Sequence, residues 1–184
     1  MASDDERYAE ALAYATEKHK GQTRREGTPY IEHPVAVAGI LKDWGYGIDY
    51  QITGLFHDLL EDTDADESVI EEIGGKEVLE AVKALTKTKG YVLDEYVDGI
   101  RHNEMAFRVK AADRLHNLKS AVKTDDEFKR KYIYETLDYY LDFSPEIPKQ
   151  VRILRESMSK PLTESDIEYE PVDDWILEYF DKEK

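Results

Sequence analysis

Apolar residues recur along most of this chain at intervals of three and four, the spacing that places them on one side of an α-helix. Residues 5–20 follow this register, and Ser3 stands before them as a candidate N-cap. Pro34 suits the first turn of a second helix, because the N–H that proline lacks has no helical partner there. Gly45 and Gly47 are expected to end that helix. Two amphipathic helices are therefore predicted before residue 47.

The same pattern continues through the rest of the first 160 residues. A third helix is predicted from near Asp49 through Leu60 without a break, because the apolar residues keep their helical spacing. Pro145 and Pro148 are expected to interrupt the chain before its last helix. The remaining helices are predicted at residues 67–73, 78–85, 92–100, 105–122, 125–143 and 151–158. Asp125 or Asp126 would cap the helix that ends at residue 143. No useful stretch alternates apolar and polar residues as a half-buried strand does, so the predicted fold class is all-α.

The 184 residues suit one helical domain with a proper core, and we expect it to occupy residues 1–160. Residues 161–184 differ in texture, because nine acidic residues there face only two lysines. We interpret this stretch as an acidic C-terminal extension, a solvated tail with one hydrophobic anchor between Trp175 and Phe180. The alternative is an arm that binds a partner or another subunit. The sequence does not specify an oligomeric state.

Composition narrows the classes of function. A net charge of −16 argues against general nucleic-acid binding, which needs a cationic face, but allows a small anionic substrate where cations gather locally. The absence of cysteine excludes disulfides and thiolate zinc sites and favours a reducing, cytoplasmic location. No apolar run approaches the roughly 18 residues of a membrane helix. The acidic N-terminus is also unlike a secretory signal.

One short segment concentrates polar groups that can hold a metal. On the predicted third helix, Glu61 lies four residues after His57 and Asp62 four after Asp58, so all four side chains would project over one side. Crowding three acids together is costly unless a cation lies among them. The alternative is an amphipathic helix whose solvent face is simply acidic, which is common in a chain with this charge.

A later helix carries a second pair of polar groups one turn apart, Asp113 and Asn117. An aspartate among valine and alanine neighbours needs a partner, and a metal or an arginine would serve. The competing interpretation is a local ion pair with Arg114 or Lys110, and the sequence leaves that choice open.

Histidines divide into one candidate ligand and several ordinary residues. His33 precedes Pro34 at a helix start and could turn inward, although a lone histidine is more often a hydrogen-bonded core or surface residue. His33 becomes a candidate ligand because the sequence offers other candidate ligands that could share a metal with it. The remaining histidines outside the metal cluster are interpreted as ordinary, namely His19, His102 and His116.

Together the candidates form a set of two imidazoles and two carboxylates: His33, His57, Asp58 and Asp113. Such a set suits Mn²⁺, Fe²⁺ or Zn²⁺ better than Ca²⁺. An ion held there would lower the pKa of a bound water and polarise a phosphoryl group. Glu61 and Asp62 exceed what ligation needs and could orient and deprotonate that water.

Cations precede the first histidine of this set. Arg24 and Arg25 lie in a polar loop, and arginine offers a fork for phosphate oxygens and a plane for stacking on a base. A solvated basic loop is the alternative. Lys87 and Lys89 are weaker candidates for the opposite rim of a site. Weaker still are Arg130, Lys131 and Tyr134, on the long later helix.

Four motifs in order carry a resemblance to a known family. They are Ala15…His19-Lys20-Gly21-Gln22, Arg24-Arg25-Glu26-Gly27-Thr28-Pro29-Tyr30-Ile31-Glu32-His33-Pro34, His57-Asp58…Glu61-Asp62-Thr63 and Val109-Lys110-Ala111-Ala112-Asp113-Arg114-Leu115-His116-Asn117-Leu118. The chain resembles the HD-domain hydrolase module of the RelA/SpoT family over residues 8–140, and specifically the small stand-alone alarmone hydrolases. The resemblance implies a single all-α HD-domain bundle that uses Mn²⁺ to remove pyrophosphate from the 3′ position of (p)ppGpp.

The resemblance also implies roles for individual residues. The metal ligands would be His33, His57, Asp58 and Asp113. Glu61 and Asp62 would activate water, Arg24 and Arg25 would hold the guanine side, and Asn117 would help to hold the ribose or phosphates.

Two departures from the family are visible. The chain is too short for the family's synthetase domain, so hydrolysis without synthesis is expected. Only about 23 residues separate Lys89 from Asp113, a stretch that looks shorter than in many alarmone hydrolases and that contributes to the rim of the substrate site. The alternatives are therefore hydrolysis of another phosphorylated nucleotide or of NADPH, and a non-catalytic nucleotide sensor.

Overall fold

The computed structural model describes residues 2–160 and 162. Within this part the chain is all-α, as the sequence predicts, and one isolated β-bridge joins Thr23 to Pro29. In chain order the helices are α1 (Asp4–Lys18), α2 (Glu32–Asp43), α3 (Ile48–Phe56), α4 (Leu59–Asp62), α5 (Glu67–Gly74), α6 (Lys76–Leu85), α7 (Leu93–Arg101), α8 (Glu104–Ala121), α9 (Asp126–Tyr139) and α10 (Glu146–Glu156).

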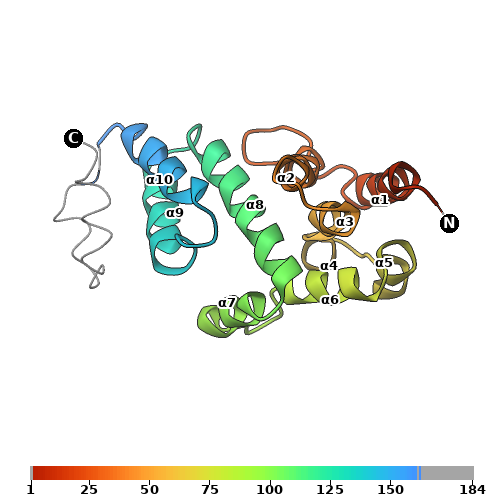
Figure 1. The fold of residues 1–184 in the computed structure, drawn as a ribbon. Helices are drawn as coiled ribbons and strands as arrows, with labels where there is room; N and C mark the ends of the chain where they lie inside the picture. Colours follow the sequence, from red (N-terminus) through yellow and green to blue (C-terminus); the bar gives the residue numbers. More distant parts are fainter. Residues whose placement is uncertain (1, 161, 163–184) are drawn as a thin grey trace.

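Helix α8 lies at the centre of the molecule. Figure 1 shows it in green, with α9 and α10 on one side and α1, α2 and α3 on the other. It packs against α2, α3, α6, α7, α9 and α10. Because residues on several sides of α8 are covered, this helix is buried over much of its length and shows no single apolar stripe.

Several predicted helix starts are confirmed together with their caps. The Ser3 hydroxyl accepts from the Glu6 N–H at 3.2 Å, and the Glu6 carboxylate accepts from the Ser3 N–H at 2.8 Å, which forms a capping box. The Asp125 carboxylate accepts from the Phe128 N–H at 2.8 Å and caps α9. Each cap involves residues only three positions apart, so it can be predicted from the sequence.

The prediction of one unbroken third helix is wrong. Helix α3 ends at Phe56, and α4 begins only at Leu59. The His57 ring donates from Nδ1 to the Gly54 carbonyl at 2.7 Å, the carbonyl that a continuous α-helix pairs with the Asp58 N–H. Asp58 has φ −102° and ψ −2°, which departs from the regular helical values of about −63° and about −42°, and the chain turns there.

The prediction of the last two helices also needs correction. Helix α9 ends at Tyr139 rather than at residue 143, although the apolar pattern continues because Tyr140 and Phe143 are buried in the core. Helix α10 begins at Glu146, with Pro148 in its first turn, rather than at residue 151. A proline costs little in that position, because the first N–H groups of a helix have no intrahelical acceptor.

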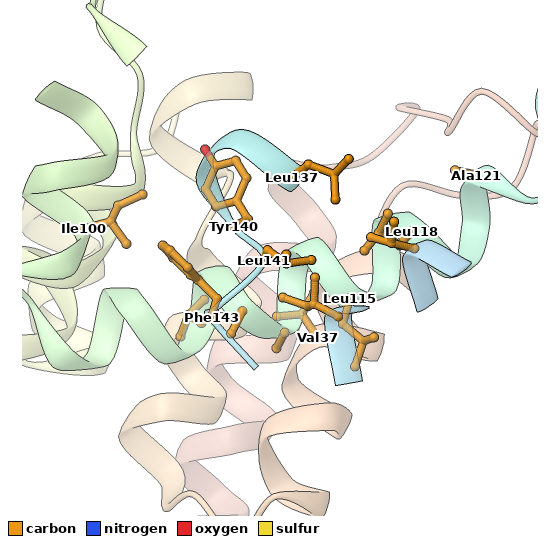
Figure 2. Close-up of a cluster of buried hydrophobic side chains, with 14 of the residues drawn as sticks. Val37, Ile100, Leu115, Leu118, Ala121, Leu137, Tyr140, Leu141 and Phe143 are labelled. Carbon is orange, nitrogen blue, oxygen red and sulfur yellow. The ribbon is translucent and has the colours of Figure 1, made fainter. Parts of the chain in front are cut away.

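The larger part of the core surrounds α8. Figure 2 shows Tyr140, Leu141 and Phe143, from the segment after α9, together with Leu115 of α8. A second group of buried side chains lies between α1, α3, α5 and α6, and includes Phe56. The apolar contacts therefore hold α8 against the N-terminal helices, which is where the candidate ligands lie.

Close packing of α2 on α3 depends on a glycine. A Cβ atom at Gly54 would lie 3.0 Å from Cδ1 of Leu41 and 3.2 Å from the main-chain nitrogen of Ala38. Since these contacts are tighter than side chains normally make, glycine allows the two helices to approach. Gly54 thereby helps to bring His33, on α2, near His57, just after α3.

The acidic C-terminal extension lies outside the described residues apart from Leu162, so the division of the chain at residue 160 stays a prediction. Among the described residues, no helix combines the length and the apolar character that crossing a membrane requires.

Candidate metal centre

The four candidate ligands converge from three segments. His33 comes from α2, His57 and Asp58 from the turn between α3 and α4, and Asp113 from α8. The two histidine Nε2 atoms lie 3.2 Å apart. Asp58 Oδ2 lies 3.0 Å from His57 Nε2, and Asp113 Oδ1 lies 3.0 Å from His33 Nε2. The side chains of the two histidines and of Asp113 are buried, and that of Asp58 is 21% exposed.

Hydrogen bonds on the far side of each ring determine what the histidines present to the centre. A carbonyl can only accept, so His57 carries a proton on Nδ1 for Gly54, and the Nε2 of its neutral ring has a free lone pair. His33 Nδ1 lies 2.7 Å from His116 Nδ1. Burial, with help from His33 and Arg24, lowers the pKa of His116 to about 4, so the His116 ring is neutral and can accept from His33.

The centre is consequently a cluster of acceptors. Two imidazole nitrogens and two carboxylate oxygens face one another, and such a gathering of acceptors is costly unless positive charge lies among them. Burial alone would lower the pKa of His57, but the charges of Asp58 and Asp113 outweigh it and raise this pKa well above its usual value. The centre thus attracts positive charge, either a proton or a metal ion.

The donor set fits a transition metal. His33, His57 and Asp58 each offer one ligand atom, and the three atoms lie within 4.8 Å of one another. Asp113 adds a second carboxylate from the opposite helix. Nitrogen and oxygen donors without sulfur suit Mn²⁺, Fe²⁺ or Zn²⁺. The structure thereby brings together all four residues that the sequence proposes as ligands.

Asp113 forms the local ion pair that the sequence allows and also faces the other candidate ligands. Its Oδ2 accepts from Lys110 Nζ at 2.8 Å, and its Oδ1 faces the histidines and accepts from Asn117 Nδ2 at 2.7 Å. Arg114 takes no part, because it donates to Glu135 instead. Burial would raise the pKa of Asp113, but Lys110 and the histidines hold it well below its usual value, so the carboxylate stays ionised.

The two surplus acids lie on α4, at the edge of the centre. Glu61 accepts from the Lys87 main-chain N–H at 2.9 Å, and Asp62 Oδ2 lies 3.4 Å from the Tyr30 hydroxyl. Burial, followed by the charges of Asp58 and Glu61, raises the pKa of Asp62. A carboxylate with a raised pKa is a better proton acceptor than an ordinary one.

The two arginines of the loop behave differently. Arg24 donates to Glu26 at 3.2 Å and to the Asn117 Oδ1 at 2.9 Å, so its guanidinium is bound to two side chains of the protein. Because Asn117 also holds Asp113, Arg24 is linked to the metal centre through one amide. Arg25 instead places its guanidinium 4.3 Å from the ring centroid of Phe128 and is exposed.

A cavity of about 610 Å³ opens over the centre. The candidate ligands His33, Asp58 and Asp113 line one part of it. Its cationic lining residues are Arg25, Lys87, Lys110, Arg114 and Lys131. A smaller cavity of about 290 Å³ adjoins it and shares Arg25, Tyr30, Asn117, Phe128 and Tyr132 with it. The arrangement can accommodate a polyanion beside the centre and a flat group next to Arg25.

Sequence reasoning missed several residues of this site. His116 was interpreted as ordinary, but it contacts His33, and its place three residues after Asp113 on α8 was the available signal. Tyr30 received no role, although its hydroxyl lies 2.6 Å from Asp58 Oδ2. Lys110 was considered only as a competitor of the metal for Asp113. In the structure it binds one carboxylate oxygen of Asp113, and the other oxygen faces the histidines.

Comparisons with known proteins agree with this geometry. A family model described as an HD domain matches residues 11–144. A probable guanosine-3′,5′-bis(diphosphate) 3′-pyrophosphohydrolase of Synechocystis is 34% identical over 141 residues, which cover 71% of this chain and 19% of that protein. The bifunctional (p)ppGpp synthase/hydrolase SpoT of Escherichia coli is 33% identical over 145 residues, covering 73% of this chain and 21% of SpoT. The chain spans about a fifth of the length of these relatives.

A solved structure shows the same fold. It is described as a metazoan ortholog of SpoT that hydrolyzes ppGpp and plays a role in starvation responses. The TM-score is 0.67 at 24% sequence identity, and the match covers 82% of this chain and 94% of that one.

Proposed function

The chain belongs to the HD-domain family, and from this membership we propose that it is a metal-dependent hydrolase that removes the 3′-pyrophosphate of (p)ppGpp and releases GDP or GTP. The named relatives, whose matching regions cover most of this chain, support the choice of substrate. We further propose Mn²⁺ as the metal, in keeping with the donor set and the resemblance to alarmone hydrolases.

One observation carries the proposal. Two imidazole nitrogens and two carboxylate oxygens converge on one point, beside a cavity that is also lined by cationic side chains. A site for a metal and a site for a polyanion are therefore adjacent. A non-catalytic sensor would need the anion site but not this cluster of ligands beside the surplus acids.

The proposed ligands are His33, His57, Asp58 and Asp113. A divalent ion bound there would lower the pKa of a water and polarise the phosphoryl group to be cleaved. Asp62 and Glu61 lie at the edge of the centre, where they orient the attacking water, and one of them takes its proton. Asp62 is the better acceptor of the two, because Glu61 is already bound to the Lys87 N–H.

The cationic part of the cavity accounts for the anionic substrate. Lys87 and Lys131 both line the larger cavity, where they would neutralise phosphate charge. Arg25, exposed beside Phe128, offers a planar surface for the guanine base in the smaller cavity. Asn117 lines both cavities, where it would hold the ribose or phosphates. Arg24, bound to Asn117 and lining the smaller cavity, is proposed with Arg25 for the guanine side.

A turnover assay tests this function. Purified protein with added Mn²⁺ is offered ppGpp, pppGpp, NADPH and common nucleotides separately, and products are resolved by ion-exchange chromatography. We expect release of GDP or GTP with pyrophosphate, and loss of turnover on chelation. Cleavage of NADPH or another nucleotide in place of (p)ppGpp would refute the proposed substrate.

Two variants make the assay specific for the site. Asp58→Ala should abolish turnover because it removes a metal ligand. Asp98→Asn is the control, because Asp98 is an exposed aspartate on α7 whose side chain pairs with His102, and its turnover should match the wild type.

A further inference from the structure

The Tyr30 hydroxyl lies between a proposed metal ligand and a proposed water-activating acid. It donates to Asp58 Oδ2 at 2.6 Å, and Asp62 Oδ2 lies 3.4 Å away. Because an ionised carboxylate can only accept, the hydroxyl is the donor in this contact. Its position links the two carboxylates through one neutral group.

The ring of Tyr30 is held in place by histidines. It lies against His19, with ring centroids 4.8 Å apart and planes inclined by 34°. On another side it meets the edge of His33, at 6.0 Å and 76°. The Tyr30 main-chain N–H donates to the Gln22 carbonyl at 2.9 Å. Because both ring and backbone are fixed, the hydroxyl has one position.

The motif His19-Lys20-Gly21-Gln22 forms the other half of the same support. His19 Nδ1 lies 2.8 Å from Gln22 Oε1, which can only accept, so His19 is the donor. This bond orients the amide so that Gln22 Nε2 donates to the main-chain carbonyl of Asp62 at 2.8 Å. Gly21, with φ +81°, allows the tight turn between the two residues.

We propose that Tyr30, supported by His19 and Gln22, is a positioning residue that orients Asp58 toward the metal and keeps Asp62 beside it. Asp58 Oδ2 contacts both Tyr30 and His57, and the two contacts together determine the rotation of the carboxylate. Without the hydroxyl, the two acids lose their shared neutral neighbour, and their mutual repulsion turns Asp58 away. Partners of this kind typically change metal affinity or activity by about 10- to 100-fold when removed.

The part of the inference that concerns Asp62 rests on the proposed function, while the part that concerns Asp58 needs only metal binding. The first measurement is therefore a calorimetric titration of metal-free protein with Mn²⁺, with no nucleotide present. Tyr30→Phe keeps the ring between His19 and His33 and removes only the hydroxyl. We expect its Kd for Mn²⁺ to rise about tenfold or more above that of the wild type.

Two further variants separate the hydroxyl from the ring. Tyr14→Phe removes another tyrosine hydroxyl, one that accepts from the Asp66 N–H at 3.3 Å on the outer side of α1, and should leave the Kd unchanged. Tyr30→Ala should weaken binding as much as Tyr30→Phe does, or more. If Tyr30→Phe retains the wild-type Kd while Tyr30→Ala loses affinity, the ring acts through packing, and the proposal is overturned.

Turnover measured at saturating Mn²⁺ tests the role toward Asp62. Tyr30→Phe should lower kcat by about tenfold with KM within about twofold, because the hydroxyl acts on the acids and not on nucleotide binding. An unchanged kcat would overturn this part. If the wild type itself fails to cleave (p)ppGpp, the proposed function fails, whereas the comparison of Kd values still decides whether Tyr30 positions Asp58.

Discussion

Replacing Asp58 by asparagine separates metal binding from folding. In the metal-free protein, Oδ2 of Asp58 meets the Tyr30 hydroxyl at 2.6 Å and His57 Nε2 at 3.0 Å. An amide NH₂ in that place can donate to the His57 lone pair and to the Tyr30 oxygen, and Tyr30 can then donate to Asp62 instead. Since each lost contact is replaced, Asp58→Asn should cost no more than about 1 kcal/mol of metal-free stability.

The consequence for the metal-bound protein is much larger, because a neutral amide is a poor ligand for Mn²⁺ or Zn²⁺. A ligand present at 100 times its Kd stabilises the folded state by about 2.7 kcal/mol. For a chain of this size, each kcal/mol raises the melting temperature by about 2–4 °C, so the wild type should gain about 5–11 °C at that Mn²⁺ excess. Asp58→Asn should gain almost nothing.

Differential scanning calorimetry with and without Mn²⁺ measures both quantities, after a titration has set the free metal concentration. Asp98→Asn is the control for replacing an aspartate by asparagine at an exposed site, and it should respond to Mn²⁺ as the wild type does. A full thermal shift in Asp58→Asn would show that Asp58 is not a ligand. No shift in the wild type would refute the metal centre itself.

Three further experiments on variants have clear expectations. Steady-state kinetics should show that Arg25→Ala raises KM with little change in kcat. Arg24→Ala should also lower kcat, because it frees the Asn117 amide that holds Asp113. Equal effects of the two variants on kcat would contradict these separate roles. Urea unfolding should show Gly54→Ala destabilised by about 1–3 kcal/mol through overpacking, whereas Gly39→Ala, whose Cβ meets nothing within 4 Å, should be neutral or stabilised. Burial would raise the pKa of Glu135, but its arginine partner lowers it, so the pair stabilises the fold above pH about 4.5 and loses this effect as pH falls through the lowered value. The stability advantage of the wild type over Glu135→Gln should therefore shrink in acid unfolding experiments below pH about 4.

Local signals in the sequence were sufficient for most helices. The Ser3 capping box and the Asp125 cap need only residues three positions apart, so they form wherever the chain is helical. The sequence also named the ligand candidates, because imidazole and carboxylate are the groups that such a metal requires. Their type and order along the chain were therefore open to prediction.

The predicted helix boundaries were wrong where a side-chain contact or burial in the core, and not a continuing helix, accounts for the apolar spacing. The break at His57 follows from a ring nitrogen that bonds to the Gly54 carbonyl, which apolar spacing cannot reveal. Tyr140 and Phe143 keep the helical pattern although they lie beyond α9, because the core buries them in another conformation. Periodicity reports burial, and burial does not require a helix.

The partners of each functional side chain were decided by tertiary structure alone. Arg24 and Asn117 are 93 positions apart, and only the packing of the loop against α8 makes them bind each other. The same packing places His116 behind His33. Residue type and spacing thus determined which groups could hold a metal, whereas the fold decided which hydrogen bonds orient them, because a hydrogen bond depends on distances and angles between segments far apart in the sequence.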